Sequence, residues 1–121
     1  MINSFVGIGR LTRDPELRRT ETGKAVAMFT IAIDRGFDGE HTDFLPVVCW
    51  DKLAENVANF LSKGSLVAVQ GNATSRVYKA RDGQNRTAIE VLARTVQFLE
   101  KKKEEQKQNN EFSIYDEYIE F

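Results

Sequence analysis

The chain has 121 residues, with 17 Lys or Arg against 18 Asp or Glu and a formal net charge of −1 at pH 7. This length suits one domain with a hydrophobic core and is too short for two domains and a linker. A single cysteine, Cys49, excludes an internal disulfide, and a single histidine, His41, leaves no second imidazole for a metal site. Carboxylates are scattered and no Ser/His/Asp set is visible, so we predict a non-enzymatic protein without cofactor or metal.

The distribution of charge and hydropathy bears on location and partners. Residues 1–11 lack the basic start and long apolar run of a secretory signal, and no window approaches membrane-spanning length. We therefore expect a cytoplasmic protein without membrane contact. Near-neutral charge is unusual for a nucleic-acid binder, but residues 1–100 hold thirteen bases against twelve acids, whereas residues 111–121 hold four acids and no base.

The first third of the chain predicts two strands around a basic connection. Residues 2–12 alternate loosely, and Gly7 and Gly9 indicate a bent strand that another backbone approaches closely. Residues 13–24 contain Asp-Pro and Thr-Gly turn signals and are predicted to be a basic loop. Residues 25–34 form a second strand. Its predicted core face consists of Ala27, Phe29, Ile31 and Ile33.

Residues 42–50 (TDFLPVVCW) predict a third strand, after a glycine-containing hairpin connection at residues 35–41 that carries Phe37 at its tip. The period of two puts Leu45, Val47 and Cys49 on a core face and Phe44, Pro46, Val48 and Trp50 on the other. Whether the aromatic side chains are packed away or displayed to a flat ligand stays open on pattern alone. Because proline has no N–H, Pro46 predicts a gap or bulge in the strand ladder between the two aromatic residues.

The second half predicts one helix and two further strands. Residues 51–63 form the helix, with Asp51 as N-cap, Gly64 at the C′ position and an apolar stripe of Leu53, Val57, Phe60 and Leu61. Residues 65–79 predict a strand with Val67, Val69, Ala73 and Val77 inward and Gln70, Asn72, Thr74, Arg76 and Tyr78 outward. After a turn at residues 80–85, residues 86–100 fit helix or strand, and their β-branched content favours strand.

Five strands with one helix after the third is the layout of an OB-fold, a barrel that binds oligonucleotides or oligosaccharides. Binding of single strands without sequence preference needs aromatic faces for the bases and basic groups for the phosphates. The candidate aromatic residues are Phe37, Phe44, Trp50 and Tyr78. The candidate basic residues are Arg10, Arg13, Arg18, Arg19, Arg35, Lys52, Arg76, Lys79, Arg81 and Arg86.

Three segments, GRLTRDPELRRTETGKAVAMFTIAIDR, AENVANFLSKGSLVAVQGNATSR and TVQFLE, closely resemble bacterial and phage single-stranded DNA-binding proteins. The resemblance covers residues 1–99. It implies a homotetrameric OB-fold protein that wraps single-stranded DNA in replication, recombination and repair. It also places the family's base-stacking aromatic residues at Phe37, Phe44, Trp50 and Tyr78, with Trp and Phe exchanged between the two strand positions relative to some members.

The resemblance further implies a division into an OB-fold domain (residues 1–100), a charged linker (residues 101–110) and an acidic aromatic tail (residues 111–121). In the family this tail ends in an acidic tip that recruits replication and repair proteins. The matching residues here are Asp116, Glu117, Ile119, Glu120 and Phe121, with Glu120 where a proline is usual. The short linker and unusual tip suggest a phage or mobile-element origin.

Two alternatives stay open at this point. The domain is also compatible with an OB-fold module for RNA or with a primosome component. A structural interaction protein that acts through its acidic aromatic tail is the alternative from a different class. Affinities for DNA, RNA and duplex separate the first from single-stranded DNA binding, and removal of Trp50 and Tyr78 separates the second.

Overall fold

The structure is a computed structural model, and it describes residues 1–37 and 39–100. The tail and linker predictions therefore lie outside the described residues. The elements are β1 (Phe5–Leu11), β2 (Glu16–Arg19), β3 (Ala25–Asp34), β4 (Thr42–Trp50), α1 (Asp51–Phe60), β5 (Leu66–Lys79) and β6 (Asn85–Phe98).

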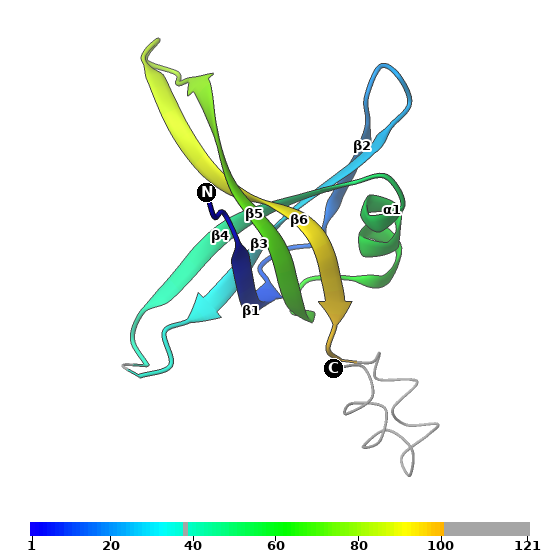
Figure 1. Cartoon of the computed structure of the whole chain (residues 1–121), viewed down its shortest axis with the longest axis vertical. Helices are drawn as coiled ribbons and strands as arrows, with labels where there is room; N and C mark the ends of the chain where they lie inside the picture. The colour runs from blue at the N-terminus through cyan, green and yellow to red at the C-terminus, as the bar shows by residue number, and fades with distance from the viewer. Residues whose placement is uncertain (38, 101–121) are drawn as a thin grey trace.

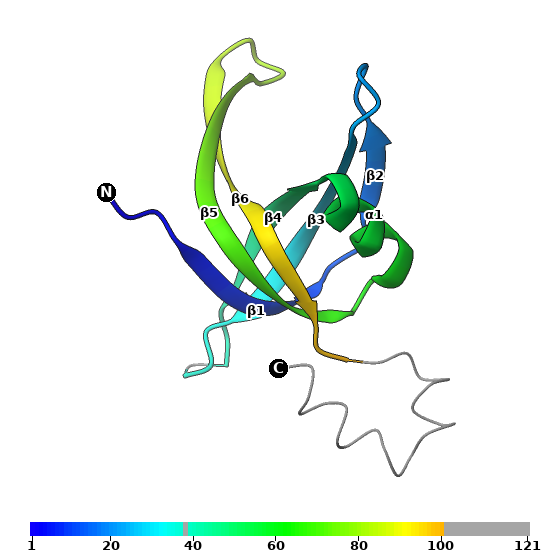
Figure 2. The same ribbon diagram turned by 45° about the vertical axis from the view of Figure 1, so that its right-hand side comes forward.

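The strands close into a ring. Their order is β1-β5-β6-β4-β3-β2, and an additional pairing of β1 with β3 joins the two ends. All pairs are antiparallel except β4 with β6. Since β1 and β2 both pair with β3, they are two segments of one interrupted first strand, and α1 follows the third strand of a five-stranded ring (Figures 1 and 2). The predicted OB-fold is confirmed.

The barrel interior is filled by the faces that the period of two assigned to it. Ile31 of β3, Val47 and Cys49 of β4 and Val67 of β5 are completely buried. Val57 of α1 is also completely buried and belongs to the same cluster. Burial of such side chains contributes on the order of 1.5–3 kcal/mol each to folding. The predicted bounds of β3 and β4 match the observed ones.

The prediction of a loop over residues 13–24 is wrong, because β2 lies within it. This strand pairs with β3 from Glu16↔Met28 to Arg19↔Ala25. All four of its side chains are exposed, so no apolar alternation marks it in the sequence. The turn signal itself is correct: Gly23 has φ 88°, and its N–H donates to the Thr20 carbonyl.

Asp51 is not the N-cap of α1. Trp50 occupies that position, without a side-chain hydrogen bond to the helix. Asp51 instead has φ 59°, a left-handed conformation that aspartate tolerates better than most residues. The strand thus turns directly into the helix, and the first turn is not capped by a side chain.

The helix ends earlier than predicted, at Phe60 rather than at residue 63. The Leu61 N–H still donates to the Val57 carbonyl of the helix, but the later donors bond groups outside it. The Lys63 N–H donates to the Asp14 carboxylate at 2.8 Å, and the Gly64 N–H donates to the Leu11 carbonyl at 2.8 Å. Gly64 therefore belongs to the connection to β5 and not to a helix C′ position. Phe60 was predicted in the core stripe but is 55% exposed.

The predicted break at Pro46 is also wrong. The β3–β4 register runs unbroken from Val26↔Trp50 to Asp34↔Thr42, with Pro46 opposite Thr30. The Thr30 carbonyl accepts the Thr12 N–H at 3.0 Å, so the main-chain groups of Thr30 point away from β4. Pro46 therefore occupies a non-hydrogen-bonded pair, in which its missing N–H removes no bond to β3.

Two further features concern close approach and burial. A Cβ on Gly9 would lie 2.5 Å from the Ala32 carbonyl oxygen, which confirms the predicted close approach of another backbone.

Ala73 and Val77 were predicted to point inward, but both side chains are exposed. They lie on the β5–β6 hairpin, whose end extends beyond the barrel (Figure 1). Their inward direction therefore does not bury them.

Candidate nucleic-acid interface

The outer face of β3 and β4 carries two exposed aromatic side chains. Residues that pair across neighbouring strands point to the same side of the sheet. Trp50 pairs with Val26 and Phe44 pairs with Ala32, and the ladder between these pairs is unbroken. Phe44 and Trp50 therefore share one outer face, about 20 Å apart along the strand at roughly 3.3 Å per residue.

This face continues over the closing strands of the barrel. Val48 on β4 pairs with Leu92 on β6, and Leu92 pairs with Asn72 on β5. With a period of two, Tyr78 lies on the same side of β5 as Asn72. Tyr78 pairs with Arg86, which is on the same side of the hairpin. We call this surface, from β2 through β3, β4 and β6 to β5, the outer aromatic face.

All four candidate aromatic residues are accessible. Phe44 is 63% exposed, Trp50 is 40% exposed and Tyr78 is 43% exposed on the outer aromatic face. Phe37 is 88% exposed in the β3–β4 connection. Exposed ring faces of this kind are what base stacking requires, since every base offers a π-face.

Most of the candidate basic residues form an ion pair with an Asp or Glu carboxylate. The ion pairs are Arg10–Glu100, Arg18–Glu16, Arg19–Glu55, Arg35–Asp43, Lys52–Glu55, Arg76–Glu90 and Arg86–Asp82. Solvent-exposed pairs such as these contribute only about 0–1 kcal/mol, so a phosphate can compete for the cation. Among the described residues, the candidates without an ion pair are Arg13, Lys79 and Arg81.

Arg10 has a structural task. Its guanidinium donates two hydrogen bonds to the Glu100 carboxylate, at 2.8 and 3.1 Å, and one to the Gly64 carbonyl at 2.9 Å. The hydrogen bond to Glu100 raises the pKa of Arg10, and the same bond lowers the pKa of Glu100. This contact ties β1 to the segment that follows β6, so Arg10 must release Glu100 before it can bind a phosphate.

Arg35 is held in a similar way. Its guanidinium donates to both Asp43 carboxylate oxygens, at 3.2 and 3.0 Å, and these hydrogen bonds raise the pKa of Arg35. In the β5–β6 turn, the Gln84 N–H and then Arg86 lower the pKa of the Asp82 carboxyl group. Both pairs fix hairpin ends that flank the outer aromatic face.

The outer aromatic face also contains side chains that are neither aromatic nor basic and that were not predicted as site residues. Met28 and Thr30 of β3 lie between the two β4 aromatic residues, and Glu16 of β2 pairs with Met28. The period of two on β3 was the available signal, because these positions alternate with the core residues Ala27 and Phe29.

Three further observations concern metal ligands, membrane-spanning helices and the single cysteine of the described residues. No group of three or more His, Cys, Asp or Glu side chains within residues 1–37 and 39–100 is placed to hold a metal ion. Over the same residues, no helix is long and apolar enough to cross a membrane. Burial raises the pKa of the Cys49 thiol to about 11, and its Sγ–H faces the Ala27 carbonyl oxygen at 3.8 Å.

A five-stranded ring with one helix and an exposed aromatic outer face defines an OB-fold protein. The chain belongs to the single-strand binding protein family, whose family model matches residues 2–99. It is 52% identical over 103 residues to single-stranded DNA-binding protein 3 of Clostridium acetobutylicum, covering 82% of this chain and 72% of the relative.

Two further relatives show similar values. Single-stranded DNA-binding protein 3 of Listeria innocua is 50% identical over 106 residues, covering 84% of this chain and 66% of the relative. Single-stranded DNA-binding protein A of Bacillus subtilis is 50% identical over 106 residues, covering 84% of this chain and 62% of the relative. The matched region thus spans about two thirds of the length of these relatives.

Proposed function

We propose that this protein binds single-stranded DNA with little sequence preference and protects it in replication, recombination and repair. The observation that carries the proposal is the exposure of Phe44, Trp50 and Tyr78 on one continuous outer face of the barrel. Family membership and the names of the relatives support the same conclusion.

Binding combines stacking and phosphate contacts. Bases stack on Phe37 and on the three aromatic residues of the outer face, and each stack contributes on the order of 1–3 kcal/mol. Arg13, Lys79 and Arg81 provide cations without an ion pair in the described chain, and the remaining basic candidates exchange an exposed carboxylate for a phosphate. Each neutralised phosphate should contribute about −0.7 to the slope of log affinity against log salt concentration. Neither base stacking nor a phosphate contact reads a base edge, which accounts for the low sequence preference.

We also propose that the protein assembles as a homotetramer. On β1, Val6 is 70% exposed and Ile8 is 54% exposed, and both point outward. Residues Phe5 to Gly9 pair with β5 on one side, whereas the pairing of β1 with β3 is confined to Arg10 and Leu11. An apolar outer face beside an open strand edge suits a second copy of the chain. Four chains of 13.8 kDa give about 55 kDa, which light scattering with and without oligo(dT) can measure.

The C-terminal tail completes the proposal. Residues 1–100 act as the binding domain, residues 101–110 as a linker, and residues 111–121 as a partner-recruiting segment through Asp116, Glu117, Ile119, Glu120 and Phe121. The support is composition, since the tail combines four acids with apolar side chains and no base. A chain ending at residue 100 should keep its DNA affinity and lose replication or repair partners; retention of both would contradict the tail's role.

The experiment that tests the binding proposal compares three matched ligands. Anisotropy titrations with single-stranded DNA, RNA of the same sequence, and duplex DNA should show the tightest binding for single-stranded DNA, because duplex bases are already stacked on one another. Equal affinity for RNA would contradict the DNA assignment. The double variant Trp50→Ala/Tyr78→Ala should lose several kcal/mol of affinity, whereas a protein acting only through its tail would lose none.

A further inference from the structure

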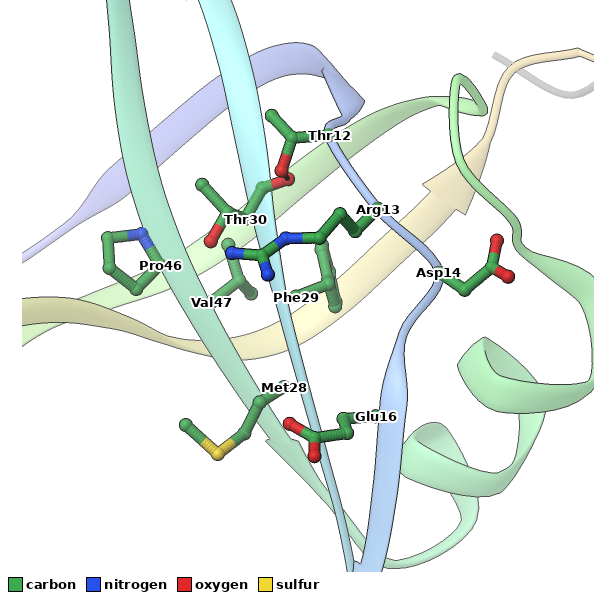
Figure 3. A pocket seen from close by; sticks show the side chains of 9 residues that line it. All are labelled: Thr12, Arg13, Asp14, Glu16, Met28, Phe29, Thr30, Pro46 and Val47. Carbon is green, nitrogen blue, oxygen red and sulfur yellow. Dashed lines mark hydrogen bonds between the residues drawn. The ribbon is translucent and has the colours of Figure 1, made fainter.

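A hollow of about 390 Å³ lies on the outer aromatic face, where the first strand of the barrel is interrupted between β1 and β2. This volume is at the lower end of the roughly 300–1,000 Å³ of ligand pockets in proteins. Nine residues line it: Thr12, Arg13, Asp14, Glu16, Met28, Phe29, Thr30, Pro46 and Val47. The break in the first strand leaves one side open, and the short ring of Pro46 leaves the other side unfilled (Figure 3).

The hollow lies between the two aromatic residues of β4. Pro46 is two residues from Phe44 and four from Trp50 on the same face of the strand. The separation of about 20 Å between these aromatic residues is several times the ~3.4 Å rise between stacked bases. For a DNA strand that runs along β4, bases stacked on Phe44 and on Trp50 are therefore not neighbours, and at least one nucleotide between them lies over the hollow.

Two side chains of opposite charge, Arg13 and Glu16, extend over the hollow. The side chains of Arg13 and Glu16 extend from the β1–β2 segment toward β4, whereas Asp14 points away from them (Figure 3). Asp14 is occupied by the Lys63 N–H. Arg13 has no ion pair with any described residue. Glu16 accepts one hydrogen bond from Arg18, at Oε1 and 2.9 Å, so its Oε2 stays available in the described chain.

Glu16 places a negative charge on the surface that is proposed to bind DNA, which is itself a polyanion. A carboxylate next to the phosphate backbone lowers affinity through repulsion unless a donor on the ligand faces it. Among the described residues its partner is Arg18, which is itself exposed and donates to only one of the two Glu16 oxygens. The base that crosses the hollow is the part of DNA that can supply the missing donor.

We propose that this hollow holds one base of the bound strand and that Glu16 favours bases with an exocyclic amino group over thymine. The inference rests on the proposed single-stranded DNA binding. Cytosine presents an N4 amino donor where thymine presents the O4 acceptor, and an ionised carboxylate can only accept. The Arg13 guanidinium has five N–H donors, so besides a phosphate it can reach the O2 carbonyl that both pyrimidines carry, and it does not discriminate between them. Stacking elsewhere on the face stays indifferent to sequence, so the preference is confined to one position per binding site.

The test compares oligo(dC) with oligo(dT) of equal length at neutral to mildly alkaline pH. The quantity measured is the ratio of the dissociation constant for oligo(dT) to that for oligo(dC), which cancels effects common to both ligands. In Glu16→Gln the amide both donates and accepts, so this ratio should fall about three- to tenfold relative to the unchanged protein. Glu21→Gln is the matched control: Glu21 is exposed, lies outside the hollow and changes the net charge equally.

A second variant tests the hollow itself. Pro46→Leu places a larger apolar side chain on the floor, and the strand tolerates it because Pro46 occupies a non-hydrogen-bonded pair with Thr30. The ratio should fall in this variant as it does in Glu16→Gln.

The outcomes separate the inference from the function on which it rests. A ratio that stays unchanged in Glu16→Gln, or that shifts as much in Glu21→Gln, overturns the selection by Glu16 while binding to both ligands leaves the proposed function intact. Absence of binding to either homopolymer by the unchanged protein overturns the proposed function instead. A lowered ratio in both Glu16→Gln and Pro46→Leu, with the control unchanged, supports the inference.

Discussion

The variant Phe44→Ala distinguishes a DNA-binding role of this ring from a role in folding, because the two roles predict different losses of DNA affinity and of stability. The residue is 63% exposed, so only about a third of its surface is buried. Full burial of a phenylalanine contributes about 1.5–3 kcal/mol, so Phe44→Ala should cost at most about 1 kcal/mol of unfolding free energy. The exposed ring should instead contribute one base stack of about 1–3 kcal/mol, and the variant should bind oligo(dT) about five- to 150-fold more weakly per site.

The protein contains a matched control for this experiment. Phe60 is 55% exposed but lies on α1, where its ring is 6.2 Å from that of Phe98. Phe60→Ala removes the same side chain at similar exposure, away from the outer aromatic face. Anisotropy titrations should show weaker binding for Phe44→Ala and unchanged binding for Phe60→Ala, with thermal melts to verify folding. Equal affinities in both variants and the unchanged protein would refute the stacking role of Phe44.

Three further predictions concern the barrel that carries this face. Gly9→Ala should lower the unfolding free energy by about 1–3 kcal/mol, because the new Cβ would lie 2.5 Å from the Ala32 carbonyl oxygen; an unchanged denaturation midpoint would speak against the close packing. Cys49, buried and with its pKa raised to about 11, should resist alkylation near neutral pH until the protein unfolds, and rapid labelling of the native protein would contradict this. The pair of Arg10 with Glu100 lowers the pKa of Glu100, so its stabilisation is present above the unfolded pKa of about 4.3 and is lost as pH falls through the folded pKa. Glu100→Gln should therefore cost less than about 1 kcal/mol at neutral pH and nothing in strong acid, and a cost that persists in acid would exclude the ion pair as its cause.

The strands with clear alternation could be predicted from the sequence. On β3 and β4, large apolar residues such as Ile31 and Val47 recur with a period of two and are completely buried. The face opposite to them followed from the same period. Whether Phe44 and Trp50 were buried there did not follow, because a strand pattern is the same for a face against solvent and for one against a second layer.

The errors arose where main-chain hydrogen bonds, rather than side-chain pattern, decide the structure. β2 has four exposed side chains and exists because its backbone pairs with β3. The helix stops at Phe60 because Asp14 and Leu11, distant in sequence, accept the N–H groups of Lys63 and Gly64.

The prediction of a break at Pro46 was also wrong because main-chain hydrogen bonding cannot be read from the sequence. A proline in a strand predicts a break only if its position would donate to a neighbour, and this depends on the pairing register. The register places Pro46 opposite Thr30 in a non-hydrogen-bonded pair. The hollow beside it could not be predicted, because it forms between segments that meet only after the barrel closes.

Fluorescence of Trp50 is the most direct test of DNA binding on the outer aromatic face, because Trp50 is the only tryptophan of the chain and its emission reports on a single position of this face. Its side chain is 40% exposed, which leaves a ring face accessible to a base. If bases stack on Trp50, oligo(dT) quenches this emission in a saturable way, and added salt restores it as the strand dissociates. Unchanged emission at oligo(dT) concentrations where anisotropy shows complete binding would exclude stacking on Trp50, since DNA would then bind without covering this face.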